Sequence, residues 1–324
     1  PGRQEVSPSA TDRAAGVLGD RARAGTPLGA LTTYRVGGAA ALSLVAEDDA
    51  DLALASRAVA ASGVPVLVLG KGSNLLVADA GFPGLVVRLG PAFAAVEVDH
   101  DGACVRAGGV TDLPVLARRS AGAGLRGLEW AVGVPGSVGG GVRMNAGGHG
   151  SDIAARLRRV RVLDLASGQD EEVAASDLDL GYRSSSVAPP QVVVWAEFGL
   201  DRGDAGDARR EVAEVVRWRR EHQPGGQNAG SVFTNPRGDS AGRLVDVSGC
   251  RGLRLGTAQV STKHANFIQS EPGGSADDVA ALIAEVARRV HARTGVVLEP
   301  ELRLVGFGVP GAPGHRSPGD PARP

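Results

Sequence analysis

The stretch that decides the fold is GVPGSVGGGVRMNAGGHG, which runs from Gly133 to Gly150. Eight of its eighteen residues are glycine, so the backbone N–H groups lie open to close approach by a ligand. The stretch is not a Walker A loop, because no Gly-Lys-Ser/Thr follows it. It also lacks the strand–turn–helix unit that surrounds a Rossmann fingerprint.

A second glycine-rich loop, LGKGSNLL, places Gly70 and Gly72 on either side of Lys71 and continues with Ser73 and Asn74. Two separate loops with Ser, Asn and free N–H groups suit a pyrophosphate, which needs close approach and many donors. For each loop alone, a tight structural turn is the alternative. The presence of both loops in one chain favours a bound dinucleotide.

Composition describes an ordinary globular protein: 324 residues, 43% of them hydrophobic and 22% charged, with a net charge of -1. This balance gives no electrostatic reason to expect a nucleic acid or membrane partner. No apolar run approaches the roughly 18–20 residues that span a bilayer, and the first residues lack the apolar core of a signal peptide. Cys104 and Cys250 have no metal-ligand spacing, so we expect reduced thiols, no metal site, a cytoplasmic location and, without an exposed apolar stripe, a monomer.

Periodicity and turn signals predict a mixed order of helices and strands between residues 27 and 306. Residues 1–26 and 307–324 are predicted to be poorly ordered, because they are rich in polar residues, Pro and Gly. The expected helices cover 48–63, 111–124, 204–222 and 275–295. The expected strands cover 64–70, 84–89, a hairpin at 93–109, 157–165, 171–175, 191–200 and 296–306. These elements predict a domain at 27–203, split near residue 88, and a second domain at 204–306.

Three further motifs carry candidate chemistry. In GYRSSS, the guanidinium of Arg183 offers paired donors for a carboxylate, although a surface arginine is the alternative. In AGSVFTNP, Ser231 has no GxSxG elbow and no triad around it, which argues against a hydrolase. In LEPELR, Glu299 and Glu301 alternate with apolar residues, and Glu301 on a strand could simply face solvent.

The order of these motifs resembles the UDP-N-acetylenolpyruvoylglucosamine reductase family, flavoenzymes of peptidoglycan synthesis. The resemblance covers residues 27–306 and rests on TTYRVGGAA, LGKGSNLLV, GVPGSVGGGVRMNAGGHG, GYRSS, AGSVFTNP, GRLVDVSGCRGLRLGTAQVSTKHANF and LEPELR. It implies an α+β fold: a two-part FAD-binding unit of the vanillyl-alcohol-oxidase type, followed by a C-terminal α+β substrate-binding domain. It also implies non-covalent FAD, NADPH as co-substrate, and the enolpyruvyl ether of UDP-N-acetylglucosamine as substrate.

Site residues carry over from the family motifs one at a time. The catalytic positions match Arg183, Ser231 and Glu301, the last chosen over Glu299 because the family glutamate directly precedes an apolar residue and an arginine. The implied FAD-binding residues are Gly70, Lys71, Gly72, Ser73, Asn74, Gly133, Pro135, Gly136, Ser137, Gly139, Asn145 and Gly147. The implied substrate-binding residues are Tyr182, Asn235, His264 and Asn266. In the implied reaction, hydride passes from NADPH through flavin N5 to the enolpyruvyl group, Arg183 and a protonated Glu301 stabilise the charge, and Ser231 donates the proton.

The chain departs from the family pattern in three places. The SVAPPQ loop after the YR motif is short, His222 stands at a position that is commonly lysine, and Thr234 replaces another lysine. Two other functions are considered: a flavin oxidase that tethers FAD through a histidine, for which His149 is the nearest residue, and an inactive UDP-sugar-binding relative. The joint presence of Arg183, Ser231 and Glu301 argues against the inactive relative.

Overall fold

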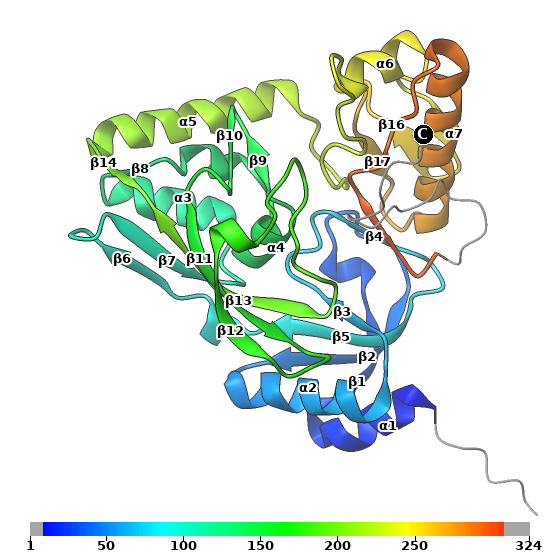
Figure 1. Cartoon of the computed structure of the whole chain (residues 1–324). Coiled ribbons are helices and arrows are strands. Elements are labelled where there is room, and N and C mark those ends of the chain that lie inside the picture. Colours follow the sequence, from blue (N-terminus) through cyan, green and yellow to red (C-terminus); the bar gives the residue numbers. More distant parts are fainter. Residues whose placement is uncertain (1–8, 308–324) are drawn as a thin grey trace, which may run out of the picture.

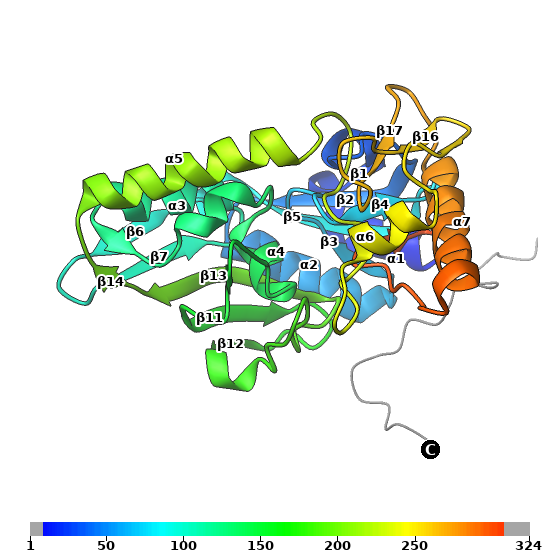
Figure 2. The same cartoon turned by 90° about the horizontal axis from the view of Figure 1, so that it is seen from above.

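The structure, a computed structural model, describes residues 9–307 and forms three bodies (Figure 1). The first two build on separate sheets, and the third is a smaller C-terminal body at one end of the molecule, beyond the end of α5 (Figure 2). The predicted α+β class is confirmed. Nearly all of the tail predicted to be disordered lies outside the described residues, as do the first eight residues.

The first body is a four-stranded sheet in the order β1-β2-β5-β3, with α1 and α2 packed beside it. Its elements are α1 (Ala10–Leu18), β1 (Arg23–Pro27), β2 (Ala39–Ala46), α2 (Asp49–Ser62), β3 (Val66–Val68) and β5 (Phe82–Leu89). As predicted, α2 begins after an acidic N-cap, Asp48, and ends at Gly63 in the left-handed conformation.

The prediction of a poorly ordered stretch at residues 1–26 is wrong for its described part. Ser9 forms a capping box with Asp12 at the start of α1, and this helix buries Ala14 and Leu18 in the core of the first body. Strand β1 then pairs with β2. The sequence of this stretch is mostly polar because only one narrow face of α1 is apolar.

The second body is an antiparallel five-stranded sheet in the order β12-β11-β13-β7-β6, as the strand and hairpin signals predicted. Its strands are β6 (Val96–Asp99), β7 (Cys104–Gly108), β11 (Leu157–Asp164), β12 (Asp170–Ala174) and β13 (Gln191–Gly199). Helix α3 (Leu113–Gly122) and the short 3-10 helix η4 (Glu129–Gly133) cover one side of its core. The predicted division near residue 88 falls at the end of β5.

Helix α5 (Ala205–His222) belongs to the second body, and not to the C-terminal domain that the sequence pattern assigned to 204–306. Its buried residues Ala208, Val212 and Val215 join the same core as Leu116 of α3. Figure 1 shows α5 lying over α3. The boundary therefore moves to the end of α5, because a helix belongs to the core that its apolar face fills.

The C-terminal body packs α6 (Ala241–Val247) and α7 (Ala276–Thr294) with a three-stranded sheet, β15 (Arg254–Leu255), β16 (Ala258–Val260) and β17 (Ile268–Ser270). Ser275 caps the start of α7 and Gly295 caps its end, which agrees with the predicted range 275–295. Its apolar stripe, Val279, Ile283, Val286 and Val290, is buried.

Several contacts join the C-terminal body to the first one. Strand β18 (Arg303–Val305) leaves the C-terminal body and pairs in parallel with β4 (Leu75–Val77), which follows the KGSN loop. The carboxylate of Asp79 accepts hydrogen bonds from Ser275 Oγ at 2.6 Å and from Ala276 N at 3.0 Å, at the start of α7. The predicted strand at 296–306 is thus only three residues long, and Glu301 lies in the extended segment before it.

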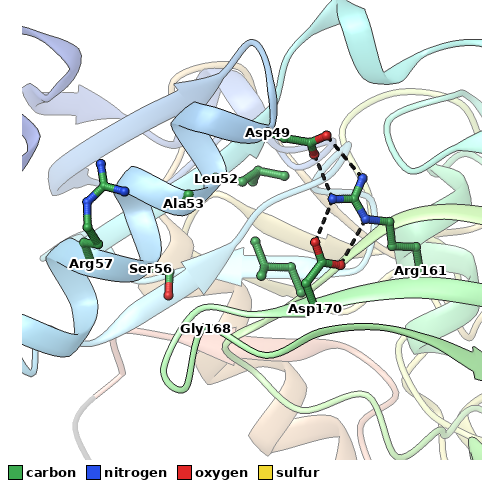
Figure 3. Close-up of a pocket in the computed structure, with 9 residues that line it drawn as sticks. Asp49, Leu52, Ala53, Ser56, Arg57, Arg161, Gly168 and Asp170 are labelled. Atoms are coloured by element: carbon green, nitrogen blue, oxygen red, sulfur yellow. Dashed lines mark hydrogen bonds and ion pairs between the residues drawn. The ribbon is translucent and has the colours of Figure 1, made fainter.

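A hollow of about 310 Å³ lies between α2 and the β11–β12 hairpin (Figure 3). Arg161 of β11 pairs with Asp170 of the same hairpin at 2.7 Å and reaches Asp49 of α2 at 3.0 Å. No predicted site residue lines this hollow. It belongs to the joint between the first two bodies, which these ion pairs brace.

No helix between residues 9 and 307 is long and apolar enough to cross a membrane. In the same part of the chain, no three His, Cys, Asp or Glu side chains are grouped so as to hold a metal ion. Both cysteines are free thiols: Cys250 is buried and Cys104 is partly exposed.

Candidate active site

The two glycine-rich loops lie against each other. A Cβ at Gly70 would collide with Ser137 Oγ, and a Cβ at Gly136 would lie 3.3 Å from Ser73 Oγ. Ser137 caps α4 (Val138–Arg143) by accepting a hydrogen bond from Gly140 N at 3.3 Å. The two loops therefore meet at Gly70, Ser73, Gly136 and Ser137, and we call this meeting point the cradle.

Other glycines of the predicted cofactor set make room for the protein itself. Gly72 has a φ of +59°, and a Cβ there would strike the carbonyl of Leu31. A Cβ at Gly133 would lie 3.0 Å from Arg219 of α5. At Gly139 it would lie 3.2 Å from two backbone oxygens. Close packing of the protein thus accounts for these three glycines, so their presence alone does not indicate a ligand contact.

Asn145 anchors the YR loop to the glycine stretch. Its amide nitrogen donates to Gly181 O at 2.8 Å and to Asp152 at 3.2 Å, and its oxygen accepts from Ala154 N at 2.9 Å. The side chain is buried and engaged at both ends, so its role in this structure is to position the site. Direct contact between this side chain and a cofactor, as the sequence predicted, would require these bonds to break.

Asn74 also positions the site, because its hydrogen bonds join the first body to the C-terminal body. Its side chain donates to Glu301 O at 3.0 Å, and its carbonyl accepts from Arg303 N at 3.1 Å. The cradle loop and the glutamate segment therefore hold each other in place. The remaining loop residue, Lys71, forms an ion pair with Asp112 at 2.7 Å, and Pro135 is exposed.

Arg183 and Glu301 come together as the sequence predicted for one site. Arg183 Nε lies 2.9 Å from Glu301 Oε1, and both side chains are largely shielded from solvent. The terminal nitrogens of Arg183 donate to Gly147 O at 2.8 Å and to Asn145 O at 3.5 Å. Arg183 also has a φ of +56°, a conformation that non-glycine residues rarely adopt and that is concentrated at functional sites.

Burial raises the pKa of Glu301 above its ordinary value, and the charge and hydrogen bonding of Arg183 offset part of this rise. A carboxyl group in this environment keeps its proton to a higher pH than a solvated glutamate. The pair can therefore present both a fixed positive charge and a group that gives or takes a proton.

The segment that follows Ser231 runs along the glutamate segment. Glu301 N donates to Val232 O at 2.8 Å, and Phe233 forms an antiparallel bridge with Pro300. The amide of Asn266 clamps the same segment by accepting from Phe233 N at 3.0 Å and donating to Phe233 O at 2.9 Å. Ser231 Oγ is partly exposed and has no hydrogen-bond partner among the described residues.

The predicted substrate residues differ in whether their side chains are engaged within the protein or free to contact a ligand. Asn266 is buried and committed to Phe233, so in this structure it positions the serine segment instead of facing a ligand. Asn235 accepts from Ala241 N at 3.0 Å at the start of α6. His264 is half-buried, and burial lowers its pKa. Tyr182 is 61% exposed, with its ring 5.2 Å from the Arg183 guanidinium, and is therefore free to contact a ligand.

The site also contains positive charge that sequence reasoning missed. The Nε atoms of Arg143 and Arg303 are buried, and within residues 9–307 neither guanidinium has a hydrogen bond or an ion pair. Both stand in quoted motifs, GVRMNAGG and LEPELR, and the available signal was an arginine set among apolar residues beside a site motif. Uncompensated charge beside an open cradle fits FAD, which carries an anionic pyrophosphate.

His149 does not lie free to tether a flavin. Its ring packs edge-on against Trp218 of α5 at 4.9 Å, and His222 stacks on the same indole at 4.6 Å. His149 is exposed, but its ring is packed against α5, which weakens the tethered-oxidase alternative.

Gly136→Val is expected to yield protein without bound FAD. Residue 136 has room for a Cβ, 3.3 Å from Ser73 and 3.7 Å from Leu113, so the fold survives while the valine methyls fill the cradle. Overpacking costs about 1–3 kcal/mol, which lowers FAD affinity by roughly 5–150-fold. Flavin absorbance per protein measures it, with Gly225→Val, which meets open space, as control. Full FAD loading of Gly136→Val would remove the loop from the cofactor site.

Comparison with known proteins identifies the family of this chain. A family model for an FAD binding domain matches residues 40–173, and one for the UDP-N-acetylenolpyruvoylglucosamine reductase C-terminal domain matches 222–305, a boundary that agrees with the packing of α5. The reductase of Heliobacterium modesticaldum is 42% identical over 86% of this chain and 89% of its own length. That of Acidiphilium cryptum is 43% identical over 88% and 92%.

Among solved structures, the crystal structure of UDP-N-acetylenolpyruvylglucosamine reductase (MurB) from Thermus caldophilus superposes with a TM-score of 0.75 and 38% identity. The match covers 86% of this chain and 97% of that chain. The predicted architecture, an FAD-binding unit followed by a C-terminal domain, is confirmed. The chain belongs to the UDP-N-acetylenolpyruvoylglucosamine reductase family of FAD-dependent oxidoreductases.

Proposed function

We propose that this protein reduces UDP-N-acetylglucosamine enolpyruvate to UDP-N-acetylmuramate with NADPH, in peptidoglycan precursor synthesis. The observation that carries the proposal is the Arg183–Glu301 pair at 2.9 Å, which is tied to the cradle through Asn74 and to the Ser231 segment through Val232 O. This arrangement joins a carboxylate-binding group and proton donors to a flavin site, as reduction of an enolpyruvyl ether requires.

FAD, held non-covalently by the two glycine-rich loops, supplies the hydride transfer between NADPH and the terminal carbon of the enolpyruvyl group. Gly70, Ser73, Gly136 and Ser137 lie where the two loops meet, and their N–H and O–H groups are the donors proposed for the pyrophosphate.

Arg183 binds the substrate carboxylate. Each terminal nitrogen carries two hydrogens and uses one on a backbone carbonyl, so one remains on each for a ligand. As charge builds on the carboxylate, the fixed guanidinium stabilises it without reorganising. Glu301, when protonated, adds a donor at the same place.

Ser231 donates the proton to the carbon next to the carboxylate. A hydroxyl is a weak acid, but an enolate-like carbon is a strong base, so its position decides the rate. The clamp from Asn266 and the bond between Glu301 N and Val232 O fix that position.

The experiment that tests the proposal measures NADPH consumption by the purified yellow protein with and without the UDP-enolpyruvyl sugar. We expect consumption only when both are present, and release of FAD when the protein is unfolded with acid. An inactive binding relative would hold the sugar without bleaching, and a tethered oxidase would keep its flavin after denaturation.

The reaction with substrate is expected to slow as pH rises, because Glu301 acts in its protonated form and burial raises its pKa. Above that pKa the protonated fraction, and with it the rate of flavin reoxidation, falls by up to about tenfold per pH unit. Glu301→Gln, which stays neutral, should lose this dependence. The measurement is stopped-flow reoxidation across pH. If the reoxidation rate of Glu301→Gln still falls as pH rises, a group other than Glu301 is responsible for the pH dependence.

Contacts to the UDP part remain proposals for Tyr182, His264 and Asn235, since the SVAPPQ loop is short and His222 and Thr234 stand at positions that are commonly lysine. A monomer in the cytoplasm is the state that we propose for this enzyme, because its substrate and NADPH are cytoplasmic metabolites.

A further inference from the structure

Arg143 and Arg303 place two positive charges inside the site without a counter-charge. Neither has a partner among residues 9–307, and the Nε of each is buried. Burial and, for Arg143, the charge of Arg303 lower the pKa of Arg143 to about 10, and burial lowers that of Arg303. Both therefore stay charged at neutral pH. Buried charges of this kind cost free energy unless an anion joins them.

Both arginines belong to the reacting end of the cradle. Arg143 ends α4, two residues before Asn145, whose carbonyl accepts from Arg183. Arg303 begins β18, two residues after Glu301, and its N–H bonds to Asn74. The two arginines therefore stand on the two segments that meet at the Arg183–Glu301 ion pair.

Two anions of the proposed reaction have other partners in the site. Arg183 is placed to bind the substrate carboxylate, and the N–H groups of the glycine loops serve the FAD pyrophosphate. A further anion forms at the reacting end itself, on the flavin ring after reduction. Hydride from the reduced nicotinamide brings two electrons and one proton to N5, so the ring gains one negative charge, which rests on N1 and the C2 carbonyl.

We propose that Arg143 and Arg303 together stabilise this negative charge on the reduced flavin ring and so raise the reduction potential of the bound FAD. The inference rests on the proposed function, because it needs FAD as the resident cofactor. The arginines act on the electronics of the cofactor, one of the tasks that a protein performs for a flavin, and do not recognise the substrate.

The test compares the FAD reduction potential in the wild-type holoenzyme with that in Arg143→Met and Arg303→Met, which keep length and lose charge. We expect reduced FAD to bind at least about tenfold more weakly relative to oxidised FAD, a drop of about 30 mV for a two-electron couple. Arg143→Lys and Arg303→Lys keep the charge and should restore most of the potential. Arg288→Met is the matched control, since Arg288 is exposed and pairs with Glu285 at 2.8 Å.

Sulfite gives a second readout that needs neither NADPH nor substrate. It adds through sulfur to N5 of oxidised flavin, and the displaced electron pair rests on N1 and the C2 carbonyl. The dissociation constant of this adduct is expected to rise at least about tenfold in each Met variant and to stay unchanged in Arg288→Met.

Unchanged potential and sulfite affinity in the Met variants would overturn the inference. Weaker binding of oxidised and reduced FAD alike would place the arginines at the pyrophosphate, and a lower unfolding midpoint alone would make them structural. If a Met variant does not retain FAD, Arg143→Gln and Arg303→Gln repeat the comparison under the same criterion. If the wild-type protein binds no FAD, that result would instead contradict the proposed function itself.

Discussion

Ser231→Ala is expected to bind FAD and be reduced by NADPH normally, yet to be reoxidised by the enolpyruvyl substrate roughly 10²–10⁴-fold more slowly. The loss corresponds to about 3–5 kcal/mol of barrier. The backbone around Ser231 is held by Asn266 and by the bond to Glu301, so removal of one free hydroxyl leaves the site in place. A two-step stopped-flow trace of flavin absorbance, first with NADPH and then with substrate, separates the two half-reactions.

Two further variants make this test specific. Ser231→Cys should recover part of the rate, since a thiol can donate a proton from nearly the same place. Ser248→Ala, a serine at the end of α6, should behave as wild type in both steps. Unchanged reoxidation in Ser231→Ala would transfer proton donation to water or to Glu301.

Arg183→Lys is expected to slow reoxidation by substrate roughly 10²–10³-fold and to leave reduction by NADPH nearly intact. Lysine keeps the positive charge but loses the planar fork that reaches Glu301, Gly147 O and Asn145 O together. The ammonium group would be mobile where the guanidinium is fixed, so less of the charge would be aimed at the substrate carboxylate. The substrate concentration for half-maximal reoxidation should rise as well.

A matched control is available on the surface of the second sheet. Arg159 also pairs with a glutamate, Glu197, at 3.0 Å, and Arg159→Lys should change neither half-reaction. Equal loss of both half-reactions in Arg183→Lys would contradict carboxylate binding and indicate a structural role or a contact with the nicotinamide.

The sequence predicts most of the fold because its elements are locally marked. Asp48 and Gly63 delimit α2, Ser275 and Gly295 delimit α7, and the antiparallel strands of the second body follow clear turn signals. Two boundaries were wrong for one reason. The partner of a helix face is a tertiary fact, so neither the packing of α1 on the first body nor that of α5 on the second can be read from residues 1–26 or 204–222 alone.

In the candidate site too, the sequence motifs indicate which residues are present but not how their side chains pack. Sequence motifs brought Arg183, Ser231 and Glu301 to one place, and the structure joins their segments. The same motifs could not separate residues that face a ligand from those that hold the backbone. Asn145 and Asn266 were predicted to bind ligands because they stand in the motifs, and both amides are bonded to the protein. Arg143 and Arg303 were passed over because only burial reveals a missing partner.

The pairing of β18 with β4 has a consequence for the order in which the site is assembled during synthesis. Asn74 of the loop at residues 70–74 receives its partner Glu301 only after a further 227 residues have been made, and Arg303 follows two residues later. A nascent chain that stalls before residue 301 has both glycine loops and no completed cradle. Flavin can therefore bind to the completed cradle only after the segment with Glu301 and Arg303 has been made.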